Sequence, residues 1–202
     1  MDLFGQALAD LGVRDTTRLI AITGTNGKTT TTTLVGEMLR GVGLDGVVAG
    51  NISPAALDVI MERQDAGRPL PQAWALELSS FQLETGPALD AASATVLNVT
   101  DDHLDRYAGL DDYAATKAAV FAGGGVQVLN RDDARVKAMA LAGRRAFTFG
   151  LDAPAGPDDF GVGVEAGTEW LARGGERLLQ RSELQLTGNH NVANALAALA
   201  LC

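Results

Sequence analysis

The heptapeptide GTNGKTT, residues 24–30, has the residue types and spacing of a phosphate-binding loop. The apolar residues 19–22 before it predict a buried strand, and apolar residues at helical spacing follow from Leu34 to Val42. A loop between a strand and a helix N-terminus collects unpaired backbone N–H groups and the positive end of the helix dipole, so it favours phosphate. Lys28 can then reach the terminal phosphates of a nucleotide, and the Thr29 hydroxyl can hold a magnesium ion.

The loop departs from the usual phosphate-loop pattern at one position. A glycine normally stands five residues before the glycine of Gly-Lys-Thr, and this chain has Ile22 there. An ordinary tight turn with a solvated lysine is therefore an alternative. The strand before the loop and the amphipathic helix after it favour nucleotide binding.

Glu77 interrupts an apolar segment, residues 73–78, near its predicted carboxyl end. A carboxylate in a buried parallel strand is costly unless a cation pairs with it, so we expect Glu77 to hold magnesium near the phosphate loop. The alternative is a glutamate at an exposed strand tip. Ser79, Ser80 and Gln82 follow and add polar groups at the same edge.

A second polar segment, residues 100–107, follows the predicted strand end Val96-Leu97-Asn98-Val99. His103 lies past this strand end, where the other candidates gather, and is a candidate metal or phosphate contact; a structural or solvated histidine is equally compatible with the sequence. The acids of this segment can be ligands, helix caps or plain loop residues, and we favour caps for Asp101, Asp102 and Asp105.

Lys117 and two asparagines are the remaining candidates. Lys117 falls within the apolar stripe of a predicted helix, where an ammonium either snorkels, forms an ion pair or points into the ligand site. In the ligand site it neutralises phosphate, or reacts with carbon dioxide to give a metal-binding carbamate. Asn189 is a plausible N-cap of the last helix, and Asn191 and Asn194 share one face, from which paired amides can recognise the edge of a base.

The elements that position these residues alternate between strand and helix up to about residue 150. Predicted strands are 19–23, 46–49, 73–78, 94–99, 126–130 and 146–150, and predicted helices are 29–40, 54–65, 111–121 and 133–140. Continuous apolar strands alternating with helices predict an α/β fold with a mostly parallel sheet covered on both faces. Ligands of such sheets bind at the carboxyl ends of the strands.

The pattern changes after Gly150. A Pro-, Gly- and Asp-rich loop leads to four predicted short strands, at 160–165, 169–173, 177–181 and 183–186, which predict a small antiparallel β annex. An alanine- and leucine-rich helix, 189–201, then returns to the main layer. We therefore expect one domain over residues 1–202, with its main layer at about 17–150 and 187–202 and the annex at about 160–186.

Composition narrows the class of protein. The 202 residues are 47% hydrophobic and 20% charged, with a formal net charge of −9, which argues against a nucleic-acid partner. No apolar run approaches the roughly 20 residues that cross a bilayer, and the start lacks the pattern of a signal peptide. Cys202 is the single cysteine, so no intrachain disulfide forms and a cytoplasmic location is expected.

Together these motifs resemble the Mur ligase family of peptidoglycan synthesis. The segments TGTNGKTT, GNIS, LELSSFQLE, NVTDDHLDRY, YAATK and LTGNHNVANALAAL occur in that order and span the chain. The first and last also resemble the folylpolyglutamate synthetases. LELSSFQLE and NVTDDHLDRY are most similar to the members that join D-glutamate to UDP-N-acetylmuramoyl-L-alanine. The missing first glycine of the loop is part of the family pattern.

The resemblance implies ATP-dependent amide formation through an acyl phosphate, with ATP and two magnesium ions. It places the ATP phosphates on Gly24, Thr25, Asn26, Gly27, Lys28, Thr29 and Thr30, and the adenine near Asn191 and Asn194. It assigns the first magnesium to Thr29 and Glu77, the second to His103 and a carbamylated Lys117, and the UDP-substrate to Asn51 and Ser79. The implied catalytic residues are Lys28, Glu77, His103 and Lys117.

The chain departs from the family in extent. Family members have three domains, and this chain resembles the central one alone, with about 18 residues before the first strand and none after the last helix. We expect a cytoplasmic monomer, without nucleic-acid or membrane partners, that is inactive as a ligase by itself. A nucleotide-binding module without turnover is the alternative function.

Overall fold

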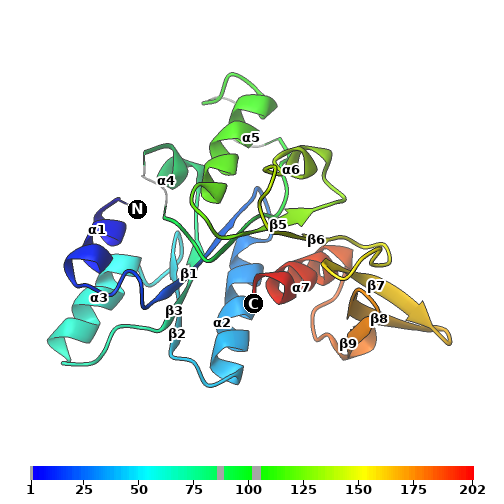
Figure 1. The fold of residues 1–202 in the computed structure, drawn as a ribbon, viewed down its shortest axis with the longest axis horizontal. Coiled ribbons are helices and arrows are strands. Elements are labelled where there is room, and N and C mark those ends of the chain that lie inside the picture. Colours follow the sequence, from blue (N-terminus) through cyan, green and yellow to red (C-terminus); the bar gives the residue numbers. More distant parts are fainter. Residues whose placement is uncertain (1, 86–88, 102–105) are drawn as a thin grey trace.

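The computed structural model describes residues 2–85, 89–101 and 106–202. Within them, nine strands form one sheet in the order β2-β3-β1-β4-β5-β6-β7-β8-β9 (Figure 1). The pairs from β2 to β7 are parallel, and those from β7 to β9 are antiparallel. The strands are β1 (Arg18–Thr23), β2 (Gly46–Gly50), β3 (Ala73–Glu77), β4 (Ser93–Val96), β5 (Val126–Asn130), β6 (Ala146–Phe149), β7 (Asp159–Glu165), β8 (Thr168–Arg173) and β9 (Glu176–Gln180).

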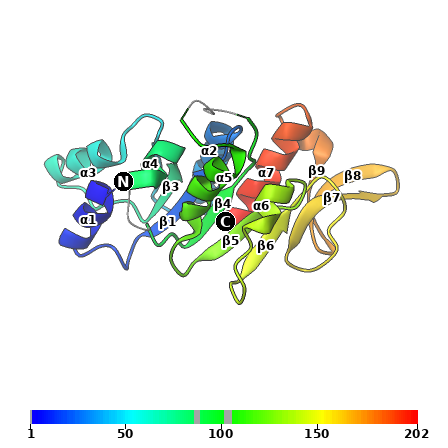
Figure 2. The ribbon, with the colours of Figure 1, turned by 90° about the horizontal axis from the view of Figure 1, so that it is seen from above.

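Helices cover both faces of the parallel part, as Figures 1 and 2 show. On one face, α2 (Lys28–Gly41) and α7 (Asn189–Leu201) pack on a buried cluster that includes Ile20 and Ile22 of β1. Leu19 and Ala21 point to the other face, because side chains alternate along a strand. The helices there are α1 (Asp2–Asp10), α3 (Ala56–Asp65), α4 (Ser80–Thr85), α5 (Leu110–Ala118) and α6 (Ala134–Ala138).

The strand order places β1 at a topological switch point. The chain leaves β1 and runs through α2 to the edge strand β2, returns to β3 beside β1, and then crosses to β4 on the other side of β1. Connections therefore diverge from the carboxyl end of β1, and a crevice at such a point is where open α/β sheets bind ligands. The fold class predicted from the sequence is confirmed.

Differences from the predicted elements have local causes. Strand β4 ends at Val96, three residues early, because Asn98 and Val99 bond to Asn26 and Asp133 outside the sheet rather than to a neighbouring strand. The predicted strand at 183–186 is wrong: Gln180 and Glu183 form a capping box that ends β9 in a 3-10 turn, η2 (Arg181–Glu183). Helix 111–121 is α5 followed by a second 3-10 turn, η1 (Ala119–Phe121), and helices α1 and α4 were not predicted.

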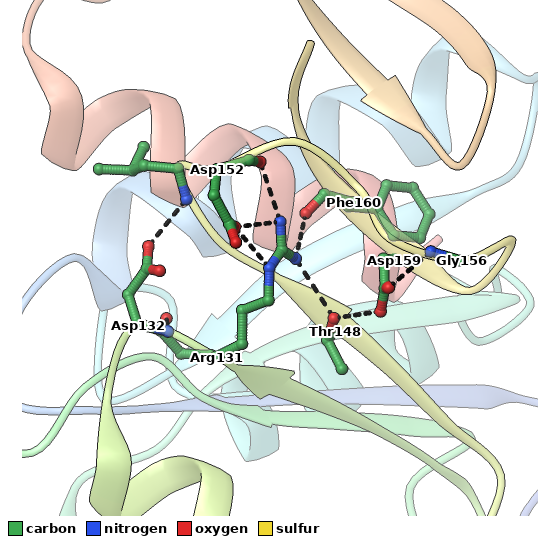
Figure 3. Close-up of polar contacts among 9 residues, drawn as sticks. Arg131, Asp132, Thr148, Asp152, Gly156, Asp159 and Phe160 are labelled. Atoms are coloured by element: carbon green, nitrogen blue, oxygen red, sulfur yellow. Dashed lines mark hydrogen bonds and ion pairs between the residues drawn. The ribbon is translucent and has the colours of Figure 1, made fainter.

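The antiparallel strands continue the main sheet, and Arg131 ties the two parts together. Its guanidinium, on a side chain only 15% exposed, donates to Asp152 Oδ1 at 2.6 Å and to the Phe160 carbonyl oxygen at 2.6 Å (Figure 3). It also donates to Thr148 Oγ1 at 3.2 Å. One side chain at the end of β5 thus connects β6, β7 and the loop between them.

None of the helices in the described part of the chain is long and apolar enough to cross a membrane.

Candidate nucleotide site

The loop between β1 and α2 has the backbone of a phosphate site. Gly27 precedes the first helical residue, Lys28, with φ at 85°, and no side chain caps the N–H groups of the first turn. Those N–H groups therefore remain available for an anion. A Cβ at Gly27 would lie 2.3 Å from Asn194 Oδ1, so a larger residue would displace the Asn194 side chain, and the positive φ favours glycine.

Glu77 is buried at the carboxyl end of β3 and bonds to two other candidates. Its side chain is 2% exposed, so the exposed-tip alternative is wrong. Glu77 Oε2 accepts from Thr29 Oγ1 at 2.8 Å, and Oε1 accepts from Asn51 Nδ2 at 3.1 Å. A carboxylate from β3, a hydroxyl from α2 and an amide from the residue after β2 thus meet at one edge of the sheet.

A close backbone approach sets the position of Asn51 beside Glu77. The Asn51 N–H donates to the Glu77 carbonyl oxygen at 2.8 Å. Gly50, with φ at 115°, allows this approach, because a Cβ there would lie 2.2 Å from the same oxygen. The end of β2 is therefore held against the end of β3.

The oxygens at this edge fit a magnesium ion that is shared with phosphates. Magnesium in nucleotide sites is usually held by one or two carboxylates together with substrate oxygens, and it keeps several waters. Glu77 Oε2 and Thr29 Oγ1 supply a carboxylate and a hydroxyl at the start of α2. Among the described residues, no three His, Cys, Asp or Glu side chains gather into a metal-binding group. A magnesium ion held by Glu77 and Thr29 would take its further ligands from phosphate oxygens and water.

Two lysines lie against the same loop. Lys28 Nζ donates to the carbonyl oxygens of Gly24 at 3.0 Å and Thr25 at 2.8 Å. Lys117, only 1% exposed, also donates to the Gly24 carbonyl oxygen at 3.0 Å, and its Nζ lies 4.4 Å from the centre of the Tyr113 ring. Lys117 therefore contacts the start of the loop from α5 rather than reaching solvent.

The segment after β4 holds the loop from the other side. Asn98 Oδ1 accepts from the Asn26 N–H at 2.8 Å, and Asn98 Nδ2 donates to the Asn26 carbonyl oxygen at 3.0 Å. Thr25 Oγ1 accepts from the Thr100 N–H at 3.1 Å. Asn98 and Thr100 were not among the candidate residues predicted from the sequence. The sequence feature that could have indicated Asn98 is an amide side chain at the carboxyl end of an apolar strand beside the central strand.

Ser79 and Gln82 have a local structural role. Ser79 Oγ accepts from the Gln82 N–H at 3.3 Å, and Gln82 Oε1 accepts from the Ser79 N–H at 3.0 Å. This pair is a capping box for α4. The S-x-x-Q pattern at 79–82 could have predicted that helix. Ser80 is buried.

The two asparagines of α7 lie on one face but differ in exposure. Asn194 is 7% exposed and donates from Nδ2 to Asn191 Oδ1 at 3.3 Å, while Asn191 Nδ2 donates to the Thr187 carbonyl oxygen at 2.9 Å. The prediction that Asn189 caps α7 is wrong. The N-cap is Gly188, and Asn189 is the first helical residue, with its Oδ1 bonded to Arg181.

His103, Asp102 and Asp105 lie outside the described residues, whereas Asp101 is exposed. The residues after them are anchored to α4. Arg106 Nη2 donates to Glu84 Oε2 at 2.7 Å, and the Tyr107 hydroxyl donates to Glu84 Oε1. The bond from Arg106, then that from Tyr107, lowers the pKa of the Glu84 carboxyl, while burial chiefly raises the pKa of the Tyr107 hydroxyl.

A strand, a GTNGKTT loop, a helix and a buried carboxylate at the switch point define a phosphate-loop nucleotide-binding domain. Residues 22–202 match the family described as "Mur ligase middle domain". The chain therefore belongs to the Mur ligase family and carries its ATP-binding middle domain.

Similar proteins match this chain over nearly all of its length, but the match covers less than half of each of them. The chain is 67% identical over 202 residues to a UDP-N-acetylmuramoylalanine–D-glutamate ligase of Aromatoleum aromaticum, and 55% identical over 204 residues to one of Nitrosospira multiformis. All of this chain is covered in both comparisons, but only 43% of each relative. A solved UDP-N-acetylmuramoyl-L-alanyl-D-glutamate–2,6-diaminopimelate ligase, 30% identical, superposes with a TM-score of 0.75 over 96% of this chain and 45% of that one.

Proposed function

We propose that this chain binds magnesium-ATP for the ligase that joins D-glutamate to UDP-N-acetylmuramoyl-L-alanine in peptidoglycan precursor synthesis. The main structural support is the bonded set Thr29–Glu77–Asn51 beside the GTNGKTT loop, at the end of the central strands. Support for the particular reaction comes from the relatives named UDP-N-acetylmuramoylalanine–D-glutamate ligase.

The backbone and the side chains of the phosphate loop have different roles in nucleotide binding. The uncapped N–H groups at the start of α2 receive phosphate oxygens, and Lys28 turns from the Gly24 and Thr25 carbonyl oxygens to the terminal phosphates. An ammonium there offsets the charge that develops as the γ-phosphoryl group is transferred. The residues assigned to the phosphates are Gly24, Thr25, Asn26, Gly27, Lys28, Thr29 and Thr30.

Magnesium would be held by Thr29 and Glu77 at a first position, and by His103 and a carbamylated Lys117 at a second. Bound there, it would neutralise the charge of the phosphates. The Thr29–Glu77 bond supports the first position, because both oxygens already face one another. Burial of Lys117 against the loop supports a role for this side chain at the phosphates.

The reaction forms one amide bond in two steps. The alanyl carboxylate of UDP-N-acetylmuramoyl-L-alanine attacks the γ-phosphorus of ATP, which gives an acyl phosphate and releases ADP. The D-glutamate amine then attacks the acyl carbon, loses a proton and displaces inorganic phosphate. Since two anions must meet, Lys28 serves to hold and neutralise the phosphates, while Asn51 and Ser79 are assigned to the UDP-substrate.

The adenine is assigned to the α7 side of the loop. Asn194 packs against Gly27, and Asn191 bonds to Asn194, so this pair leads from the loop along α7. Asn191 is the more exposed of the two and offers an amide for a base edge. Asn194 has the additional task of supporting the loop.

We further propose that residues 1–202 are one domain with a β annex at 160–186, acting as a cytoplasmic monomer without nucleic-acid or membrane partners. The net charge of −9 supports the absence of a nucleic-acid partner. By itself the chain would bind nucleotide without useful turnover, because positioning of two reactants can supply roughly 7–11 kcal/mol and the relatives are more than twice as long.

Substitution of Lys28 tests the assignment. Lys28→Ala should weaken magnesium-ATP binding by about 2–3 kcal/mol, roughly 30- to 150-fold, measured by titration calorimetry. Lys137→Ala is the matched control, because Lys137 is an exposed lysine on α6 with no contact to the loop. Equal affinities of the two variants would contradict the site. Ligation by residues 1–202 at rates near those of the longer relatives would contradict the expected lack of turnover.

A further inference from the structure

Asn98 forms a two-point clasp on the tip of the phosphate loop. Its side-chain oxygen accepts from the Asn26 N–H at 2.8 Å, and its side-chain nitrogen donates to the Asn26 carbonyl oxygen at 3.0 Å, across 72 positions of sequence. Both partners are backbone atoms. The clasp therefore fixes the two peptide planes that flank Asn26, whatever the Asn26 side chain does.

The backbone around Asn98 is itself fixed on both sides. On the side of β1, the Leu97 N–H donates to the Thr23 carbonyl oxygen at 2.9 Å, and the Thr25 N–H donates to the Asn98 carbonyl oxygen at 3.0 Å. On the side of β5, Asn130 Nδ2 donates to the Leu97 carbonyl oxygen and Asp133 Oδ2 accepts from the Val99 N–H, both at 2.8 Å. The backbone at Asn98 is therefore held in place, and its side chain can fix the position of the phosphate loop.

The clasp acts one residue before the anion-binding backbone. Asn26 precedes Gly27, whose φ of 85° directs the chain into the first turn of α2. Because the Asn26 N–H is already bonded to Asn98, it is not one of the donors left for phosphate. The orientation of the following peptides, including the Lys28 N–H, depends on the plane that the clasp fixes.

We propose that Asn98 is a positioning residue that sets the phosphate loop in its ATP-receiving conformation before the nucleotide binds. This inference rests on the proposed nucleotide function. Without the clasp, ATP would have to order the loop tip as it binds, and ordering even one residue costs enough to weaken affinity about 10-fold. Once ATP is bound, its phosphates hold the same peptides, so the chemical step is affected less.

The test compares Asn98→Ala with Gln72→Ala in the protein expressed at its natural full length. Gln72 is the matched control, since its side-chain oxygen also accepts one backbone N–H, that of Asp45 at 2.9 Å, but at the amino end of β3. Magnesium-ATP affinity is measured by calorimetry, kcat and KM for ATP by phosphate release, and thermal stability by scanning calorimetry. We expect Asn98→Ala to raise Kd and KM for ATP about 10-fold, with kcat changed less than about threefold. Gln72→Ala should leave Kd, KM and kcat unchanged.

Two results would overturn the proposal: an unchanged ATP affinity in Asn98→Ala, or a loss confined to kcat. Asn98→Leu keeps the approximate size of the side chain without adding charge and loses both the acceptor and the donor, so it should also weaken ATP binding even if the alanine variant does not fold. Lys28→Ala in the same assay separates the two hypotheses. If it weakens ATP binding and the Asn98 variants do not, only the positioning role fails; if none of them matters, the proposed function fails.

Discussion

Substitution of Gly50 by alanine should disrupt the contact between the ends of β2 and β3. The new Cβ would lie 2.2 Å from the Glu77 carbonyl oxygen and 3.2 Å from its backbone nitrogen and carbonyl carbon. Relief requires the two strand ends to separate, which breaks the Asn51–Glu77 bonds. Strain at a φ of 115° costs about 1–3 kcal/mol and forced overpacking about 1–3 kcal/mol more, so we expect a total loss of about 2–6 kcal/mol.

Gly43→Ala is the control that separates the two costs. Gly43 also has a positive φ, at 80°, but nothing lies within 4 Å of the position of its Cβ. Its variant should lose only about 1–2 kcal/mol through backbone strain. For a chain of this size, scanning calorimetry should show Gly50→Ala melting about 2–16 °C below Gly43→Ala. Equal melting temperatures would refute the close approach of Gly50 to Glu77.

Variants at two further residues, Lys117 and Asp45, test other contacts. In the full-length enzyme, Lys117→Ala should remove most ligase activity, and short carboxylic acids should partly restore it. Lys117→Arg should stay inactive, because an arginine cannot form a carbamate. An active arginine variant would exclude the carbamate. At Asp45, the hydrogen bond from Arg63 lowers the carboxyl pKa below its ordinary 3.8, so its stabilisation is present above about pH 4 and is lost as the pH falls through the lower, folded-state value. The melting temperature of Asp45→Asn should therefore fall below that of the wild type at pH 7 and converge with it at lower pH, and a difference that does not change with pH would contradict this account.

The parallel sheet could be predicted because its strands are continuous apolar segments between helical patterns. The ends of the strands and helices were harder to predict from the sequence, since they depend on partners that are distant along the chain. Val99, predicted as strand, donates its N–H to Asp133 instead of to a neighbouring strand. The strand predicted at 183–186 failed because apolar alternation over four residues does not reveal whether a strand partner exists.

Part of the candidate site could be predicted from the sequence, namely the residues that belong to local patterns. Lys28, Thr29 and Glu77 belong to local patterns whose chemistry is visible in the residue types. Asn98 does not, because its partner is a backbone 72 positions away and any residue at position 26 would present the same atoms. The sequence likewise gave no indication that Asn194 packs against Gly27, since that contact depends on how α7 returns to α2.

The return of α7 to Gly27 sets the order in which the site can form during synthesis. Residues 27 and 194 are 167 positions apart, yet a Cβ at Gly27 would touch Asn194. At about 5–20 residues per second, a ribosome needs roughly 8–33 s to extend the chain from one to the other. Through that interval the loop exists without its contact to Asn194, although both neighbours of the central strand β1, namely β3 and β4, are synthesised well before its end. The contact between the phosphate loop and α7 can therefore form only after residue 194 has been synthesised.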